Sequence, residues 1–429
     1  MTHRAKHGKI SHATARIRGL LGPGLITGAA DDDPSGIATY SQAGAQFGYS
    51  LVWTMFLSLP FMAAVQILSA WIGWNTGKGL TANFREHMPR ALVYALVCLL
   101  AIANTINIAA DLAAMSEALK LVIGGPSVLY AFLFGLACLI AEIFVPYHRY
   151  AGLLKFLTLA LFVYVATAFT ISVPWGEVFA SMLIPKLPDG QDALLMIVAV
   201  FGTTISPYLF FWQAGQEVEN TSLSHRSLYR SDRMSRFHFR RIAVDTSIGM
   251  FFSNLIAFFI IVTAAAALHA NGITKIETAA QAAEALRPLA GELTFLLFAA
   301  GIIGTGLLAV PVLAGSAAYA TAEAFGFKGS LELPASRAIG FYILIGSATL
   351  VGAGLAAAEI DAIRLLFWAA VVNGVLAAPI LFAMMWLVTR PRLTQTSDVK
   401  LPRSLIVFGW LAALMMAIVL LLTFLPASA

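Results

Sequence analysis

Three consecutive carboxylates, Asp31, Asp32 and Asp33, stand in the middle of an otherwise apolar stretch of the chain. The stretch reads LLGPGLITGAADDDPSGIATYSQAGAQFG over residues 20–48. Ionisable side chains inside long apolar segments are costly and usually functional, and oxygen ligands suit cations such as Mg²⁺, Ca²⁺ and Mn²⁺. A single Asp before a proline is explained equally well by helix capping, but capping uses one side chain. Three carboxylates in succession therefore favour a cation site.

The residues that follow the carboxylates predict a broken helix. Pro34 has no amide hydrogen and disfavours α geometry at Asp33, while Gly36 tolerates an unwound backbone. Backbone carbonyls such as that of Ala30 then have no helical partner. They must face a ligand or water, because hydrocarbon cannot satisfy them.

A second apolar stretch, DALLMIVAVFGTTISPYLFFWQAGQEVE (192–219), has a comparable interruption. Its polar and helix-breaking residues are Gly202, Thr203, Thr204, Ser206, Pro207 and Tyr208. A Ser-Pro pair alone is often only a kink. Two Gly/Pro-interrupted helices in corresponding positions of two repeats, however, are the best sequence indication of the central site of a transporter.

The composition predicts a polytopic membrane protein. Of the 429 residues, 59% are hydrophobic and 11% are charged, and the mean hydropathy is +0.82. Soluble domains carry about 25% charged residues, so the chain is not a soluble enzyme, a nucleic-acid binder or a disordered scaffold. Cys98 and Cys138 lie in apolar runs without a nearby Cys or His, and we expect both to be buried packing residues.

Runs of about 20 mostly apolar residues predict the membrane-crossing helices. Eleven such runs are present, at 17–46, 50–75, 91–119, 126–147, 151–173, 191–217, 243–268, 292–325, 337–357, 361–388 and 404–426. The sequence thus predicts an all-α fold with a tail (1–16) and one transmembrane domain (17–429). The domain would hold two repeats, 17–173 and 191–388, followed by an extra helix at 404–426.

The distribution of basic residues predicts the orientation. With the N-terminus in the cytoplasm and eleven crossings, 22 of the 27 Lys and Arg residues fall on the cytoplasmic side. The C-terminus would then be external, in a cell inner (plasma) membrane. The basic loops would lie beside an anionic lipid leaflet, so the high isoelectric point requires no nucleic acid.

The first stretch contains short motifs in a fixed order, namely Gly22-Pro23-Gly24, Asp33-Pro34-Ser35-Gly36, Ala38-Thr39 and Gln42-Ala43-Gly44-Ala45. Together they resemble the pattern GPG…DPGN.AT…QAGA of the NRAMP family of divalent-metal transporters. Weaker similarities are Asp111-Leu112-Ala113, Asp245-Thr246, Asn254 and Ala299-Ala300-Gly301. The resemblance implies a LeuT-like fold with a 5+5 inverted repeat and with helices 1 and 6 broken.

The resemblance also implies a set of ligands. In the family, the metal is held by the Asp and Asn of DPGN, by the Met of a sixth-helix MPH motif and by backbone carbonyls from both breaks. The matching positions here are Asp33, Gly36, Ser206 and the carbonyls of Ala30 and Thr203, with Tyr208 in place of the His. The sulfur ligand of the family is therefore absent.

The loss of sulfur predicts a change of cation. Thioethers favour transition metals, whereas oxygen ligands suit Mg²⁺ and Mn²⁺, and Mg²⁺ usually keeps several of its waters. The pattern resembles the NRAMP-related magnesium transporters and predicts import of a largely hydrated Mg²⁺, and also of Mn²⁺, by alternating access. As hypotheses, one of Asp31 and Asp32 contacts the waters of the ion and the other attracts cations.

The resemblance bears on proton coupling as well. The Asp and Glu of the family's DLAE motif are associated with the proton route, and here Asp111 is kept but the Glu position is Ala114. We therefore expect weak or absent proton coupling, while a purely structural role for Asp111 is an equal alternative. Gln213 and Glu217 lie on one helix face, where they would line a cytoplasmic vestibule, while the alternative for Glu217, near the helix end, is that it is simply solvated.

Three other functions remain as alternatives. One is a proton-coupled importer of Mn²⁺ or Fe²⁺, as in the better-known members of the family. Another is a channel or an organic-cation carrier that uses the acidic triplet as a counter-ion. An enzyme is the least favoured, because the spans contain no nucleophile–base pair. We expect a monomer whose metal ion is the transported substrate and which has no cofactor.

Overall fold

The computed structural model describes residues 22–145, 159–223, 232–358, 360–391 and 399–424. Within these ranges the chain is helical and contains no strand. The principal helices are α2 (Pro23–Asp31), α3 (Pro34–Phe47), α4 (Trp53–Thr76), α5 (Leu80–His87), α6 (Arg90–Ile123), α7 (Ser127–Phe144), α9 (Phe162–Thr170), α10 (Trp175–Leu183), α11 (Gln191–Thr204), α12 (Pro207–Leu223), α13 (Asp232–Ala267), α14 (Ala279–Glu284), α15 (Arg287–Ala290), α16 (Thr294–Phe325), α17 (Ile339–Ala356), α18 (Ala362–Val388) and α20 (Arg403–Phe424).

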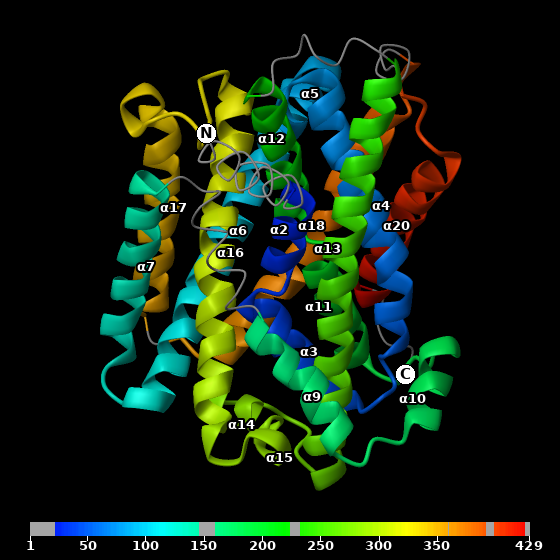
Figure 1. The fold of residues 1–429 in the computed structure, drawn as a ribbon, viewed down its shortest axis with the longest axis vertical. Coiled ribbons are helices and arrows are strands. Elements are labelled where there is room, and N and C mark those ends of the chain that lie inside the picture. Colours follow the sequence, from blue (N-terminus) through cyan, green and yellow to red (C-terminus); the bar gives the residue numbers. More distant parts are fainter. Residues whose placement is uncertain (1–21, 146–158, 224–231, 359, 392–398, 425–429) are drawn as a thin grey trace, which may run out of the picture.

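The long helices form a bundle around four shorter ones (Figure 1). Helices α2, α3, α11 and α12 lie in its interior, where α13 packs along α2 and α3 and where α18 packs along α11. Helix α5 lies at one end of the bundle, and α10, α14 and α15 lie at the opposite end. The segments that the basic residues assign to opposite sides of a membrane are thus at opposite ends of the molecule.

Nine helices in the described residues are long and apolar enough to cross a membrane, and a bent pair at Leu159–Thr170 and Trp175–Leu183 would make ten. The predicted first span is present as two helices of 9 and 14 residues, separated at the expected break. Part of the predicted fifth span, at 151–158, lies outside the described residues. The full count of eleven therefore stays a prediction.

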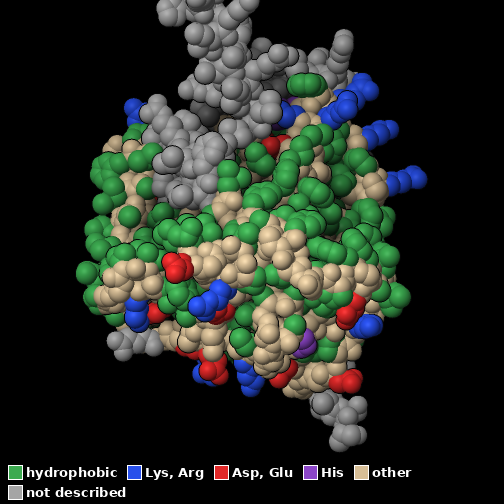
Figure 2. All heavy atoms as spheres, turned by 60° about the horizontal axis from the view of Figure 1, so that its bottom comes forward, with side chains coloured by type: hydrophobic (Ala, Val, Ile, Leu, Met, Phe, Trp, Pro, Cys, Tyr) green, Lys and Arg blue, Asp and Glu red, His purple; other side chains and the backbone are tan. Residues whose placement is uncertain are grey.

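The outer surface is that of a membrane protein. Figure 2 shows a broad band of hydrophobic side chains, with acidic and basic side chains mixed toward the end that lies at the bottom of Figure 1 and further Lys and Arg side chains at the opposite end. Cys138 is buried as expected, but the prediction for Cys98 is wrong because this residue is exposed. Cys98 lies on the same face of α6 as Leu99 and Ile102, each of which is 52% exposed. This face points away from the rest of the bundle.

Glycines bring α2 and α13 into backbone contact. A Cβ atom on Gly28 would lie 2.6 Å from the Cα of Gly249, and one on Gly24 would lie 2.6 Å from the Cα of Thr246. Side chains at these positions would separate the two helices. The inner half of the first span is therefore held directly against α13.

Candidate functional site

The first break is set by Pro34. An α-helical carbonyl accepts from the amide four residues later, and for Ala30 that residue is Pro34, which has no amide hydrogen. Helix α2 ends at Asp31, and Asp33 has extended geometry (φ −70°, ψ 168°) before α3 begins at Pro34. The carbonyl oxygen of Ala30 thus lacks its helical donor, as the sequence predicts.

The second break repeats this arrangement. Thr203 stands four residues before Pro207, so its carbonyl also lacks a helical donor. Helix α11 ends at Thr204, Ile205 leaves helical geometry (φ −118°, ψ 54°), and α12 begins at Pro207. The hydroxyl of Ser206 donates to the carbonyls of Thr203 (2.8 Å) and Gly202 (3.0 Å), which leaves its own lone pairs open.

The two carboxylate oxygens of Asp33 have different partners. Oδ1 accepts from the backbone amide of Gly36 at 2.7 Å, which caps α3. The phenol of Tyr208 lies 3.3 Å from Oδ2 and 3.2 Å from the carbonyl oxygen of Ala30. The capping interpretation of Asp33 is thus correct for one oxygen, while the other faces the second break.

Asp31 and Asp32 share a single hydroxyl donor. The Oγ of Ser253, on α13, lies 2.6 Å from Asp31 Oδ2 and 3.0 Å from Asp32 Oδ1. The other oxygen of Asp31 is buried without a hydrogen-bond partner. Asp32 also lines a mainly apolar cavity of about 240 Å³ between α2, α13 and the start of α9. These two carboxylates therefore share a partner on α13, whereas Asp33 contacts Tyr208.

Asp111, on α6, reaches the same region. Its side chain is fully buried, and its electrostatic neighbours are Asp33 and the backbone amide of Ser35. Neither carboxylate oxygen makes a hydrogen bond of ordinary geometry. Tyr40 is likewise fully buried and lies close to the acidic triplet. The third span thus contributes a fourth carboxylate beside the first break.

These four carboxylates are buried without a basic partner. Asp31, Asp32, Asp33 and Asp111 are at most 2% exposed. In the part of the chain that the structure describes, the ion pairs lie elsewhere, at Lys78–Glu86, Lys120–Glu117, Glu217–His238 and Arg287–Glu284. Burying a carboxylate is unfavourable unless a proton, a cation or hydrogen bonds compensate its charge. The site is therefore suited to attract a cation.

The candidate cation site is formed by side chains and backbone carbonyls from separate helices. Among the described residues, no three His, Cys, Asp or Glu side chains are grouped in a way that could hold a metal ion by themselves. The candidate ligands that do meet are Asp33, the carbonyl of Ala30 and Tyr208. Gly36 and Thr203 lie opposite each other, since a Cβ on Gly36 would be 2.9 Å from Thr203 Oγ1. Their role as ligands stays a prediction.

The two pathway residues on α12 lie on the side of the breaks that carries α5. Gln213 is fully buried and accepts a hydrogen bond from Thr27 on α2. Glu217 lies 3.9 Å from His238 and lines a cavity of about 120 Å³ beside Gly22 and Asp245. The structure thus places Glu217 at a small cavity and Gln213 between this cavity and the breaks, and their role in an ion pathway stays a prediction. Asn373 of α18 accepts a hydrogen bond from Asn107 of α6 at 3.0 Å, so this pair joins two helices.

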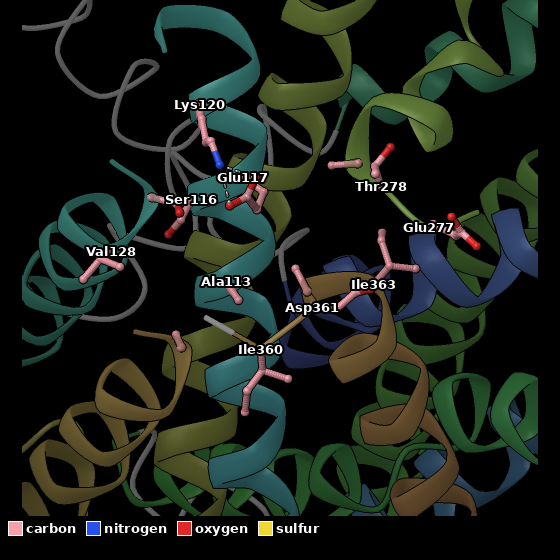
Figure 3. A pocket seen from close by; sticks show the side chains of 14 residues that line it. Ala113, Ser116, Glu117, Lys120, Val128, Glu277, Thr278, Ile360, Asp361 and Ile363 are labelled. Carbon is pink, nitrogen blue, oxygen red and sulfur yellow. Dashed lines mark hydrogen bonds and ion pairs between the residues drawn. The ribbon is translucent and has the colours of Figure 1, made fainter. Parts of the chain in front are cut away.

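Two larger cavities open at the opposite end. One of about 350 Å³ is lined by Glu117 and Lys120 of α6 together with Glu277 and Asp361 (Figure 3). The other, of about 540 Å³, shares Glu277, Asp361 and Ile363 with it. Both are rimmed by charged side chains of either sign. They lie at the end of the molecule that carries α14.

An apolar layer separates these cavities from the carboxylates. Its members are Ile37, Ala38, Ala114, Ala279, Ala282, Phe298, Ile302, Ala362, Ile363 and Leu366, around a space of only about 10 Å³. Ile37 stands one helical turn after Asp33, and Ala114 stands three residues after Asp111. Apolar side chains therefore pack next to the acidic residues on the side that faces these cavities.

Sequence reasoning missed Ser253 and Tyr40. Ser253 contacts two of the three carboxylates from a distance of more than 220 positions in the chain. The sequence contains one sign of a role for Ser253: it forms, with Asn254, a polar pair inside an apolar run, and polar residues in spans are often functional. Asn254 itself donates to Ser58 on α4, so it belongs to the packing of α13.

Comparison with known proteins agrees with this architecture. The sequence matches the family described as "Nramp: Natural resistance-associated macrophage protein-like" over residues 24–425. It is 31% identical to the "Divalent metal cation transporter MntH" of Yersinia pestis (strain Pestoides F) over 296 residues, which are 67% of this chain and 68% of that protein. It is 29% identical to the protein of the same name from Klebsiella pneumoniae (strain 342), over 72% of this chain and 73% of that protein.

The fold is also similar to that of solved structures. A manganese transporter of Eremococcus coleocola, solved in complex with an aromatic bis-isothiourea substituted compound, matches with a TM-score of 0.73 and 16% identity, over 94% of this chain and 86% of that one. At this identity the match concerns the fold alone. These relatives are named as transporters and not as enzymes. The chain belongs to the Nramp family.

Proposed function

We propose that this protein is a secondary transporter that imports divalent cations, with Mg²⁺ as its main substrate and Mn²⁺ as a second one. The observation that carries the proposal is the burial of Asp31, Asp32, Asp33 and Asp111 around the first break, where Asp33 and the proline-freed carbonyl of Ala30 meet Tyr208 of the second break. The Nramp relatives are named divalent metal cation transporters, which supports the general activity. The preference for Mg²⁺ is argued from the ligands.

The oxygen character of the site supports Mg²⁺. The sixth-helix position that carries a thioether in the resembling family is Ser206, whose hydroxyl points at the backbone of its own helix. The position of the family's Asn is Gly36, which has no side chain. Carboxylate, carbonyl and hydroxyl oxygens suit Mg²⁺ and Mn²⁺ better than softer ions. A hydrated ion would reach these oxygens through its own waters.

The driving force need not be a proton gradient. A membrane potential supplies about 2.3 kcal/mol per charge for each 100 mV, and a divalent ion gains about twice this amount. Ala114 and Tyr208 replace the titratable residues of the resembling family, so we propose weak or absent proton coupling. In this proposal the N-terminus and the Glu217 cavity face the cytoplasm, and the Glu277 cavities face outward.

The test is transport by the purified protein in liposomes. Uptake of Mg²⁺, Mn²⁺ and Cd²⁺ is followed at fixed membrane potential, with a pH-sensitive dye inside the vesicles. We expect saturable uptake of Mg²⁺ and Mn²⁺ that rises with negative internal potential and leaves the internal pH unchanged. Empty liposomes provide the background.

Two outcomes would contradict the proposal in different ways. Uptake of Cd²⁺ and Mn²⁺ with internal acidification and without Mg²⁺ flux would identify a proton-coupled transition-metal importer. Single-channel currents, or flux that does not saturate, would identify a channel.

A further inference from the structure

Tyr208 bridges the two breaks through one hydroxyl group. Its backbone carbonyl accepts a hydrogen bond from Ser316 of α16 at 2.7 Å, which fixes the start of α12. Its ring is fully buried, and its phenol reaches the first break at Asp33 Oδ2 and Ala30 O. The phenol also lies within the electrostatic influence of Asp31 and Asp111.

The phenol contacts the two oxygens that a bound ion would need. The other oxygen of Asp33 is already engaged by the amide of Gly36 at 2.7 Å, so Oδ2 is the one available for an ion. The carbonyl of Ala30 is available because Pro34 supplies no amide hydrogen. A cation that binds these oxygens, directly or through its first waters, therefore competes with the Tyr208 proton for them.

The geometry of the phenol suits a contact that is readily displaced. Its distances of 3.2 and 3.3 Å are longer than the 2.7–2.8 Å usual for hydroxyl donors, and one proton is shared between two acceptors. The bond is thus weak enough to open when a cation arrives. It nevertheless partly satisfies the carbonyl of Ala30, which has no helical donor, and adds to the hydrogen bond that Asp33 receives from Gly36.

We propose that Tyr208 is a latch that stands in for the ion when the site is empty. The phenol proton joins the two breaks in the empty carrier, so that the empty form can close and return to the side from which it loads. Ion binding opens the latch, because both events use the same two oxygens. Tyr208 is thereby a positioning residue for the return step and a competitor of the ion.

This inference rests on the proposed cation site, and it makes a specific kinetic prediction. Tyr208→Phe removes the phenol proton and keeps the ring. The Kd for Mn²⁺, measured by calorimetry on the full-length protein, should fall about three- to tenfold, since one hydrogen bond no longer competes with the ion. Net Mn²⁺ uptake into liposomes should slow, because it requires the return of the empty carrier. Exchange of internal for external Mn²⁺ omits that step and should keep its wild-type rate.

A matched control and a second variant complete the test. Tyr319→Phe removes another buried phenol, on α16. This phenol donates to the carboxylate of Glu219 at 2.7 Å. Glu219 lies near the C-terminal end of α12, far from the breaks. Tyr319→Phe should leave net uptake and exchange unchanged. Tyr208→Leu also lacks the hydroxyl and should reproduce the pattern of Tyr208→Phe if that variant does not fold.

The inference and the proposed function fail separately. In Tyr208→Phe, an unchanged or higher Kd for Mn²⁺, or an equal loss of net uptake and exchange, would overturn the latch. The phenol would then be a ligand or a packing group. Absence of Mg²⁺ flux in the wild-type protein would overturn the Mg²⁺ preference alone. The latch is tested with Mn²⁺ and does not depend on that result.

Discussion

Gly36 and Thr203 face each other across the two breaks, at a distance that leaves no room for a side chain on Gly36. A Cβ atom there would lie 2.9 Å from the Oγ1 of Thr203. The first break can therefore accept a larger residue only if the Thr203 hydroxyl rotates away. Since that hydroxyl is buried without a hydrogen bond of ordinary geometry, the rotation breaks no strong contact.

This relationship bears on cation selectivity. We expect the double variant Gly36→Asn, Ser206→Met to raise the ratio of Cd²⁺ to Mg²⁺ uptake by about tenfold, because a thioether favours soft ions. Competition between Cd²⁺ and Mg²⁺ in liposomes measures the ratio. Gly36→Asn alone, which adds no sulfur, should change this ratio less than the double variant. An unchanged ratio in the double variant would mean that other positions set the choice of ion.

Asp33 should be indispensable for transport through its charge. Asp33→Asn keeps an oxygen that can cap α3 but removes the negative charge, and we expect it to lower Mg²⁺ and Mn²⁺ uptake by at least about tenfold. Asp361→Asn, measured at saturating ion concentration so that charge at the rim of the outer cavities does not limit uptake, is the matched control, because Asp361 caps α18 through the amide of Arg364 at 3.2 Å. It should stay within about twofold of the wild type, since Asn and Asp are similar caps. Equal losses in both variants would indicate that helix capping is what matters.

Ser253 should tune the affinity of the site through Asp31 and Asp32. Ser253→Ala removes the one hydroxyl within reach of both carboxylates. We expect the apparent KM for Mg²⁺ to change by about three- to tenfold with little change in maximal rate, the size expected for loss of one hydrogen bond to a charged group.

The corresponding control is Ser116→Ala, whose hydroxyl donates within its own helix to Leu112 at 2.5 Å. It should leave the KM for Mg²⁺ unchanged. An unaltered KM in Ser253→Ala as well would place Asp31 and Asp32 outside the path of the ion.

The close contact between α2 and α13 should make the stability of the fold sensitive to any side chain added at its glycines. Gly28→Ala places a methyl group 2.6 Å from the Cα of Gly249, and such overpacking costs about 1–3 kcal/mol. Gly354→Ala is the control, because no atom lies within 4 Å of its Cβ position and alanine favours the helix. Thermal unfolding in detergent should show a lower Tm for Gly28→Ala and an equal or higher Tm for Gly354→Ala. The reverse order would mean that the two helices are not in contact at these glycines.

The breaks could be predicted from sequence because their cause is local. Pro34 and Pro207 remove an amide hydrogen wherever they occur in a helix, so the carbonyls of Ala30 and Thr203 lose their donors regardless of the rest of the fold. The apolar runs likewise predict most of the long helices, since length and hydropathy are properties of the segment alone.

The contacts between distant segments could not be predicted in this way. That Ser253 reaches Asp31 and Asp32 depends on the rotation of α13 against α2. That Cys98 faces outward depends on which face of α6 packs inside, and an apolar run gives no sign of this. The dual role of Asp33, as cap and as partner of Tyr208, follows only from the approach of α12.

The paired prolines have an evolutionary consequence. Two of the oxygens at the centre of the molecule come from the main chain at Ala30 and Thr203, so no change of side chain at those positions can remove them. Under the proposed function, substitutions at positions 36, 206 and 208 would change the ligands offered to the ion while the interrupted helices persist unaltered. One scaffold can thereby diversify through a handful of codons.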